Sequence, residues 1–318
     1  MGEEFNIVHN FIENFIKEPI EKTGNYWFVR TDRGHNFNNF TTGGFIGIGW
    51  NDISIEDMDD DKIEITKTKI ARLERLDQTE SRDKSKVTSI YNKLKRFTSL
   101  QKGDIIISPS KKAYKIAFGI VKENNCYFEN IPTDFCEYQK RIKVEWVSIK
   151  PFEQLDSMFY QIKGTRHSIS DIKKYAPFID KEMNTIYIKN NSGHYVVDVR
   201  SSDDINTFSL LEFIKQTNYF ISLINEEFNF NENIDDSSIK LNVQSPGKIE
   251  FKIPGGKTMV MLAFLIPFIG CEDSETNTPR ELITPIQKIK SENTEQIEDY
   301  KKAMNELNIK YDSIVSFH

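Results

Sequence analysis

The feature that most constrains the fold is a series of short apolar segments between residues 103 and 147, each bounded by turn residues. Gly103 and Asp104 precede the first segment, and Pro109 ends it. Further segments follow at intervals of about 8–12 residues, a spacing typical of antiparallel barrels and sandwiches. The segments cover residues 105–107, 113–121, 126–128 and 142–147. This pattern predicts a small barrel or a strongly bent sheet.

Other strands and helices are predicted on both sides of this series. Residues 26–30 and 45–49 have strand character, and Gly43-Gly44 supplies the turn before the second of them. Apolar residues recur at helical spacing in residues 5–18 and 84–97. A third helix is predicted to begin at a cap formed by Ser168 or Ser170 and to end near Pro177.

The second half of the chain has a different pattern. A long helix is predicted over residues 205–228, and a last helix with a narrow apolar stripe begins at Pro279. Residues 258–271 carry no charge, but the run is shorter than the ~20 residues that span a membrane. It is therefore a buried core element, or alternatively an oligomer interface or a membrane-inserting segment. Strands are predicted at residues 195–199, 239–243 and 248–253.

Together these elements predict an α+β fold. We expect an N-terminal helix in residues 1–24, a bent-barrel domain in residues 25–180, and a smaller mixed α/β domain in residues 181–318. A hydrophobic fraction of 38% and an aromatic fraction of 12% exclude a wholly disordered chain.

Composition also narrows the chemistry. The three cysteines are too few and too widely spaced for a disulfide framework, and there is no CxxC or HxxxH pair for a structural zinc site. The first residues lack a basic segment followed by an apolar run, so no targeting signal is predicted. We therefore expect a cytoplasmic protein without a metal or other cofactor.

The net charge of −6 argues against a basic nucleic-acid coat protein. The charge is unevenly distributed, however: residues 52–61 are acidic, whereas residues 82–102 hold seven basic residues against one aspartate, a local sum of +6. The basic helix is a candidate for contacts with the nucleic-acid backbone, or alternatively a solvated face balanced by the acidic stretch. The candidate phosphate-binding residues are Lys84, Lys86, Lys93, Lys95 and Arg96.

An ordered set of residues gives the most specific signal in the first half. The set is Trp27 to Arg30, Phe40, Ile48-Gly49-Trp50, Phe97, Gly103-Asp104, Pro109, Gly119-Ile120, Tyr127, Arg141, Val144 and Trp146. In this order it resembles the PUA-like/EVE-type domain of Mrr-type restriction proteins and other bacterial defence proteins, over residues 25–180. One departure is that Thr31, Asp32 and Arg33 precede Gly34, where that family has an earlier glycine.

The resemblance implies a bent β-barrel with a pocket that accepts a flipped, often modified, base. Such a base needs aromatic faces for stacking and a few polar groups for its edge. Each tryptophan is alternatively a core residue, and Arg141 alternatively pairs with a carboxylate. The candidate ligand-binding residues are Trp27, Arg30, Trp50, Ser108, Tyr127, Arg141 and Trp146.

The second half contains a weak nuclease pattern. Asp236 lies upstream of Glu250 and Lys252, an order found in PD-(D/E)xK nucleases, where two acids bind Mg²⁺ and the lysine helps to activate water. Asp198 is an alternative acid. Residues 255–258 read Gly-Gly-Lys-Thr, but a phosphate loop needs glycine where this chain has Phe251.

We therefore expect a sensor of DNA or of a modified base or nucleotide, part of a bacterial anti-phage defence or restriction system. Its C-terminal half would assemble into a homo-oligomer or contact a partner protein through residues 258–271 and the last helix. One alternative is a modification-dependent, Mg²⁺-dependent DNA endonuclease. Another is a non-catalytic scaffold or a membrane-associated effector.

Overall fold

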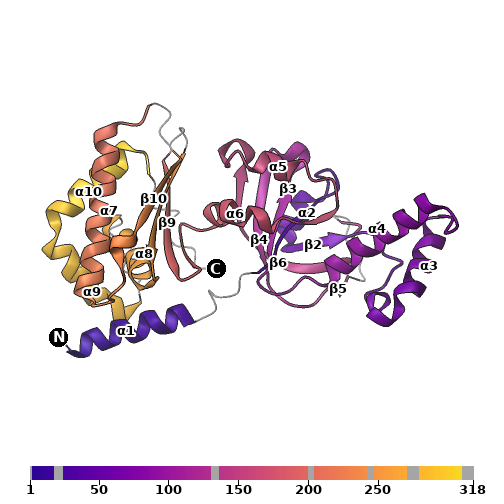
Figure 1. The fold of residues 1–318 in the computed structure, drawn as a ribbon, viewed down its shortest axis with the longest axis horizontal. Helices are drawn as coiled ribbons and strands as arrows, with labels where there is room; N and C mark the ends of the chain where they lie inside the picture. The colour runs from indigo at the N-terminus through magenta and orange to yellow at the C-terminus, as the bar shows by residue number, and fades with distance from the viewer. Residues whose placement is uncertain are drawn as a thin grey trace. The chain divides into compact units, whose positions relative to one another are not determined.

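The computed structural model describes residues 2–17, 24–129, 136–199, 204–242, 247–270 and 279–309, and it divides into two compact units (Figure 1). The first, here called the half-barrel unit, is Thr23–Ile179. The second, here called the helix–sheet unit, combines Met1–Lys22 with Asp180–His318. Both contain helices packed on a sheet, so the predicted α+β class is confirmed.

The half-barrel unit is built on a curled sheet with the strand order β2-β6-β4-β3-β1-β7, with β5 paired to β6 (Figure 1). β1 and β3 are parallel, and the other described pairs are antiparallel. The strands are β1 (Tyr26–Val29), β2 (Phe45–Ile48), β3 (Ile105–Pro109), β4 (Lys115–Val121), β5 (Tyr127–Phe128), β6 (Lys140–Pro151) and β7 (Ile169–Asp171).

The long strand β6 produces the curl. Its first residues, from Lys140 to Lys143, pair with β2, whereas the residues from Val144 onward pair with β4. The pairing shifts by one residue between Phe118 and Gly119 of β4, because β6 has Val147 as an extra residue between their partners Ser148 and Trp146. Such a bulge increases the local twist of a sheet. A Cβ at Gly119 would lie 2.5 Å from the Val144 side chain, so this bend requires glycine. The predicted strongly bent sheet is confirmed.

Helices cover the curled sheet and extend beyond it. In α4 (Ser81–Thr98) the apolar residues Val87, Ile90 and Leu94 are buried, as their helical spacing predicts. Two neighbouring helices, α2 (Phe37–Gly43) and α3 (Ile63–Leu73), were not predicted. The others in this part of the chain are α5 (Phe159–Lys163) and α6 (Ala176–Met183), which runs across the boundary between the units.

The prediction of a helix that ends near Pro177 is wrong. Ser170 instead lies in β7 and pairs with Phe28. The short helix that begins at Lys173 has no side-chain cap, so Ser168 does not cap it. Pro177 stands in the first turn of α6, where its missing N–H removes no intrahelical hydrogen bond. The proline therefore begins a helix at this position and does not end one.

The helix–sheet unit has an antiparallel sheet in the order β10-β11-β9-β8. Alternate residues of β11, namely Ile249, Phe251 and Ile253, face the helices and are buried. The strands are β8 (Ile186–Lys189), β9 (Ser192–Val199), β10 (Ser238–Asn242) and β11 (Gly247–Pro254). The helices are α1 (Gly2–Lys17), α7 (Thr207–Glu227), α8 (Lys257–Gly270), α9 (Arg280–Glu292) and α10 (Thr294–Glu306).

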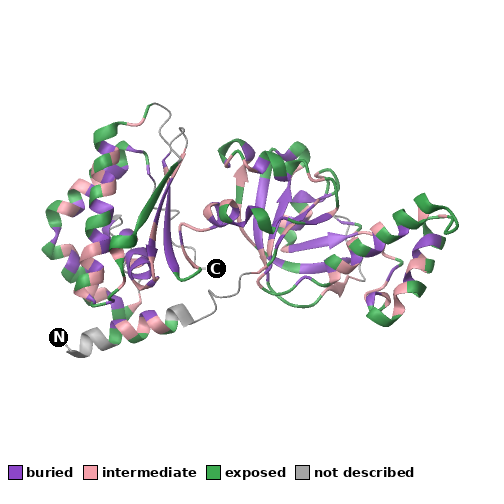
Figure 2. Cartoon of the chain, viewed as in Figure 1, coloured by how far each residue is buried: buried purple, intermediate pink, exposed green. Residues whose placement is uncertain are grey.

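Residues 258–270 of the uncharged run belong to α8, which lies in the core of this unit (Figure 2). From Met259 to Ile269, all side chains except Phe264 and Pro267 are at most 3% exposed. The buried-core interpretation of the run therefore holds, and its side chains do not offer the exposed apolar surface that an interface or a membrane contact needs. Cys271 lies outside the described residues.

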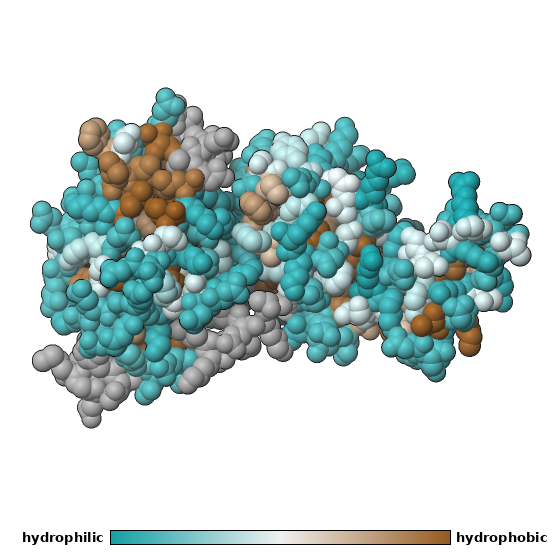
Figure 3. All heavy atoms as spheres, viewed as in Figure 1, coloured by the Kyte–Doolittle hydropathy of each residue, from teal (hydrophilic) through white to brown (hydrophobic). Residues whose placement is uncertain are grey.

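Within the described part of the chain, no helix combines the length and the apolar character needed to cross a bilayer. Exposed apolar side chains of the helix–sheet unit lie elsewhere and include Phe208 and Leu211 of α7 and Ile239 and Leu241 of β10. Figure 3 shows a brown apolar area on the surface of this unit, whereas the half-barrel unit is mainly teal.

The N-terminal helix α1 packs in the helix–sheet unit. Val8 and Ile12 of α1 are buried in the same apolar cluster as α8. The predicted last helix is two helices, α9 and α10, with the non-helical residue Asn293 between them. Their predicted apolar stripe is buried within the unit.

Candidate functional site

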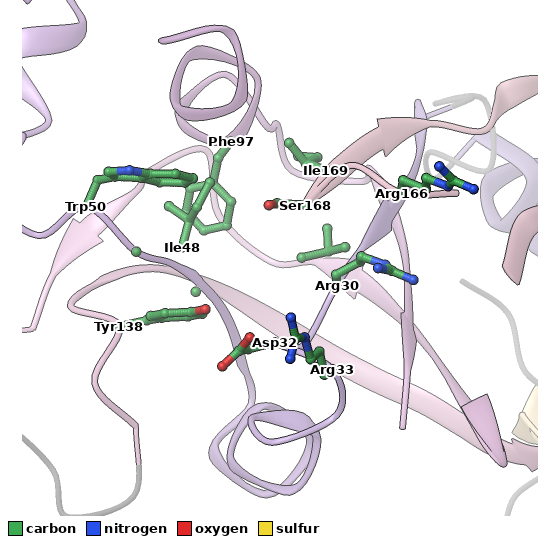
Figure 4. Close-up of a pocket in the computed structure, with 13 residues that line it drawn as sticks. Arg30, Asp32, Arg33, Ile48, Trp50, Phe97, Tyr138, Arg166, Ser168 and Ile169 are labelled. Atoms are coloured by element: carbon green, nitrogen blue, oxygen red, sulfur yellow. The ribbon is translucent and has the colours of Figure 1, made fainter. Parts of the chain in front are cut away.

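The half-barrel unit contains a cavity of about 320 Å³, within the range of roughly 300–1,000 Å³ typical of small-molecule sites. Aromatic rings and short loops form its walls. Figure 4 shows the rings of Trp50 and Tyr138 on opposite sides, with Phe97 and Ile48 near the first and Asp32 near the second. The remaining lining residues include Arg30, Arg33, Arg166, Ser168 and Ile169.

Trp50 is held in an unusual backbone conformation where β2 ends. Its φ of 57° lies in the left-handed region, which is rare for a bulky residue and often marks a functional site. The indole N–H donates to Glu74 Oε1 at 2.8 Å, and the Trp50 carbonyl accepts from Lys140 Nζ at 2.5 Å. Both the ring and the backbone of Trp50 are therefore fixed beside the cavity.

Tyr138 lies against two glycines of the opposite strand. A Cβ at Gly47 would lie 2.9 Å from Tyr138 Cβ, and one at Gly49 would lie 3.4 Å from its ring. Burial raises the pKa of Tyr138 to about 12, and the nearby Asp32 carboxylate also acts in this direction. The phenol therefore stays protonated at neutral pH and can donate a hydrogen bond into the cavity.

The loop after β1 carries charged side chains to the mouth of the cavity. Asp32 and Arg33 have φ values of 47° and 56°, and Gly34 follows at 96°, so three successive residues are left-handed. The buried Thr31 hydroxyl donates to the Pro109 carbonyl at 2.6 Å and anchors this loop. The exposed Asp32 and Arg33 side chains are thus presented by an anchored turn (Figure 4).

The charges lining the cavity are mainly positive. Arg30, Arg33 and Arg166 stand against the single carboxylate of Asp32. The backbone N–H of Arg30 donates to the Ser168 carbonyl at 2.8 Å, which places these two residues side by side at the sheet edge. The site therefore combines aromatic faces, anion-binding cations and a few hydrogen-bonding groups.

Two further cavities with basic linings adjoin this one. The first, of about 520 Å³, lies along α4 and includes Lys84, Lys93, Arg96 and His167. The second, of about 420 Å³, includes Lys111, Lys112 and Lys163, together with Arg30 and Arg33 from the central cavity. We call these the α4 groove and the loop groove.

Of the predicted ligand residues, the structure brings Arg30 and Trp50 into the central cavity. The other tryptophans are used as structural anchors: the Trp27 indole donates to Asp104 at 3.0 Å, and that of Trp146 donates to the Phe40 carbonyl at 2.7 Å. Ser108 is 0% exposed and donates to the Val29 carbonyl. These three contacts satisfy the indole N–H groups of Trp27 and Trp146 and the hydroxyl of Ser108 within the fold. The predicted ligand roles of these three residues are therefore not supported.

Tyr127 and Arg141 also lie outside the cavity lining. Tyr127 is half-buried on β5, paired with Arg141 on β6. The Arg141 guanidinium donates to the carbonyls of Tyr138 and Cys136 and lies 4.2 Å from the centre of the Phe45 ring. Arg141 therefore fixes the backbone that carries Tyr138, which is a positioning role.

Sequence reasoning missed Tyr138, Asp32, Arg33, Arg166 and Ser168. Glycines at alternate positions 47 and 49 of a predicted strand were the available signal, because such spacing indicates close approach of another group. Of the predicted phosphate-binding residues, Lys84, Lys93 and Arg96 lie in the α4 groove. Lys86 and Lys95 instead form ion pairs with Asp83 and Asp60.

The structure does not bring the predicted nuclease residues together. Glu250 of β11 is buried and binds His194 Nδ1 at 2.8 Å and Lys181 Nζ at 2.7 Å. Asp236 accepts from Asn233 at 2.6 Å and is not among these partners. Lys252 lies two residues beyond Glu250 on β11 and forms no ion pair within the described residues. No group of three metal-binding side chains gathers within the described residues.

The environment of Glu250 predicts a pH-dependent contribution to stability. Burial opposes ionisation, but the hydrogen bonds from His194 and Lys181 outweigh it and lower the pKa to about 2 from an ordinary 4.5. A depressed carboxyl pKa stabilises the fold above pH 4.5, and this stability is lost as pH falls towards 2. Glu250→Gln should therefore be less stable at neutral pH, with a deficit that shrinks below about pH 4.5. Urea midpoints by circular dichroism from pH 6 to pH 3 measure this, and a constant deficit would contradict it.

Comparison with known proteins gives one match. A family model described as Domain of unknown function (DUF8426) matches residues 27–173. No curated protein and no solved structure matches the chain. All residues lining the central cavity, from Val29 to Ile169, fall inside the matched segment.

Proposed function

We propose that the half-barrel unit binds nucleic acid and accepts one unstacked base in the central cavity. The observation that carries this proposal is the pair of rings, Trp50 and Tyr138, on opposite sides of the cavity (Figure 4). The charged residues that line the same cavity are three arginines and one aspartate. An aromatic face offers stacking to any base, worth about 1–3 kcal/mol per base.

Polar groups of the cavity suit the edge of a base. The Tyr138 hydroxyl is a donor, the Asp32 carboxylate is an acceptor, and the Ser168 hydroxyl can act as either. A base withdrawn from its stack needs such donors and acceptors in place of its pairing partner. Arg30 and Arg166 add cations for the phosphate that accompanies the base.

We further propose DNA carrying a modified base as the ligand, in a bacterial defence or restriction setting. This part rests on the ordered residues Trp27 to Trp146 and their resemblance to PUA-like/EVE-type domains. Titration with oligonucleotides that differ only in one modified cytosine tests it. We expect tighter binding of the modified strand, and equal affinities would contradict this part alone.

Replacing the cavity aromatics should weaken binding. Trp50→Ala and Tyr138→Ala each remove one stacking face, so we expect about 5- to 150-fold weaker binding. Fluorescence anisotropy of a labelled 12-nucleotide single strand at low ionic strength measures the dissociation constant. Tyr138→Phe keeps the ring and isolates the contribution of the hydroxyl.

A matched control is Tyr160→Ala in the same unit. Tyr160 is 65% exposed, contacts Phe152 and does not line the cavity. We expect wild-type affinity for this variant. If Trp50→Ala and Tyr138→Ala also bind as tightly as the wild type, the base-binding proposal is wrong.

A further inference from the structure

We infer that the cavity takes the base of an internal nucleotide of a strand, with the phosphates on its two sides held in the α4 groove and the loop groove. This inference rests on the proposed function. A mononucleotide carries its phosphates on one side of the sugar only, whereas an internal nucleotide continues into backbone in both directions. Two basic grooves that adjoin one base-sized cavity match the second ligand.

The α4 groove is formed by two neighbouring rows of a single helix. One row runs from Lys84 to Arg96 and the other from Ser81 to Lys93, each in steps of four residues, so both rows lie on one face. Hydroxyl and amide side chains lie between Lys84 and Arg96 on one row and precede Lys93 on the other. Such side chains are the usual contacts of protein with phosphate and sugar oxygens.

The α4 groove lies next to the central cavity. Lys93 Nζ lies 5.7 Å from the centre of the Trp50 ring, so one lysine borders both. His167 lines the groove, while its neighbours Arg166 and Ser168 line the cavity. A strand in the α4 groove can therefore pass directly to the cavity mouth.

The loop groove adjoins the cavity at Arg30 and Arg33, which line both. Its floor is made where two loops meet: a Cβ at Gly34 would lie 2.2 Å from the Lys111 backbone. Lys112 is left-handed, with a φ of 55°. Lys163 completes the basic lining from α5. Figure 4 shows Arg33, which lines the loop groove, and Trp50, which Lys93 of the α4 groove approaches, at different sides of the cavity.

Several cations of the grooves have no carboxylate partner, whereas some other lysines of the unit are paired. Lys86 and Lys122 form ion pairs with Asp83 and Glu145. Across the described residues, Lys84, Arg96 and Lys111 form no ion pair with a carboxylate. These three side chains can therefore pair with phosphates of a nucleic acid. Such pairing releases counterions from the phosphates, so the affinity for nucleic acid should fall as the salt concentration rises.

The test compares two double variants with a matched control. Lys84→Ala/Arg96→Ala empties the α4 groove of two cations, and Lys111→Ala/Lys163→Ala does the same in the loop groove. Lys86→Ala/Lys122→Ala removes the same charge from paired positions. Each protein is titrated with a 12-nucleotide single strand, as DNA and as RNA, over a range of salt, and with a mononucleotide.

We expect each groove variant to bind the 12-nucleotide strand at least about tenfold more weakly, with a salt slope lower by about 1.4 for two lost phosphate contacts. Mononucleotide affinity should fall in at most one of the two groove variants, because this ligand has phosphate on one side only, and the retained binding also shows that the variants are folded. The control should match the wild type. The DNA and RNA arms show which sugar the grooves accept.

Three results would overturn the inference. Groove variants that bind the strand like the wild type, while Trp50→Ala weakens binding, leave a pocket for a lone nucleotide. A loss confined to one groove variant indicates a terminal nucleotide. An equal loss in the paired-lysine control indicates a general effect of net charge. Failure of the proposed function is a separate result, because there Trp50→Ala and Tyr138→Ala would have no effect.

Discussion

Glu232→Ala is expected to lower the free energy of unfolding of the helix–sheet unit by about 3 kcal/mol. Glu232 Oε1 accepts from the backbone N–H groups of Gly256 at 2.5 Å and Lys257 at 2.7 Å, and Oε2 accepts from Thr258 at 3.0 Å. These are orphan donors at the start of the buried helix α8, where the helix dipole also favours an anion. Alanine would leave all three donors without this partner.

The surroundings of Glu232 show that this carboxylate is placed by the fold. Asn225 Nδ2 donates to the Glu232 carbonyl at 3.1 Å, and Asn225 Oδ1 accepts from the Glu232 N–H at 3.0 Å. A Cβ at Gly255, whose φ is 87°, would lie 2.2 Å from Glu232 Oε1. The Gly-Gly-Lys-Thr sequence therefore surrounds an internal carboxylate at the position where a phosphate loop would hold a phosphate.

The effect of Glu232→Ala can be assigned to one unit because of where the tryptophans lie. All three tryptophans, Trp27, Trp50 and Trp146, belong to the half-barrel unit, so tryptophan fluorescence reports that unit alone. Glu232→Ala should shift the urea transition seen by circular dichroism and leave the fluorescence transition in place. Glu227→Ala, which removes a half-exposed partner of Lys288, is the control and should cost less than about 1 kcal/mol. Equal effects of the two variants would contradict the capping role.

Much of the half-barrel could be predicted because its signals are local. Turn residues such as Gly103 and Pro109 mark strand ends, and the spacing of Val87, Ile90 and Leu94 marks the buried face of α4. Helix α3 was missed because it follows an acidic stretch and contains β-branched residues, which favour strands. The bend at Gly119 depends on Val144 and has no local signal.

The cavity could be predicted only in part because distant segments build it. Arg30 and Trp50 were found as residues at strand ends, but their neighbours Tyr138 and Ser168 come from segments about a hundred residues further along. Conversely, Trp27 is an aromatic residue of the kind that binds bases, yet its indole N–H donates a hydrogen bond to Asp104. Whether an aromatic side chain faces a cavity depends on pairing register, which a single sequence does not reveal.

The charged residues of β11 show the same limit. Glu250 and Lys252 form a nuclease-like pair by spacing alone, but the fold gives Glu250 the partners His194 and Lys181. Lys248, on the same face of the strand, lies between Glu182 and Asp198. The face of this sheet opposite the apolar core therefore carries a network of largely buried ion pairs that connects the sheet to α6, and removing these pairs should lower stability.

Lys248→Met is expected to destabilise the helix–sheet unit by about 3–5 kcal/mol. Lys248 Nζ lies 3.3 Å from Glu182, whose side chain is 1% exposed, and also binds Asp198. Burial opposes the charge of Lys248, but the two carboxylates outweigh it and raise its pKa, so the lysine is charged across the neutral range. Methionine keeps the apolar stem and removes only the charge, so the buried Glu182 carboxylate loses the cation that lies 3.3 Å from it.

A double variant separates this ion pair from packing. Replacing both members of a buried ion pair costs far less than replacing one. Asp198, the carboxylate that remains in the double variant, has a side chain that is 28% exposed to solvent. Lys248→Met/Glu182→Gln should therefore recover at least about half of the stability lost in Lys248→Met, as read from the circular dichroism transition in urea. Lys252→Met, a half-buried position of the same strand face, should change the transition by no more than about 0.5 kcal/mol. If the double variant is as unstable as the sum of the two single variants, the loss comes from packing and the ion pair contributes nothing.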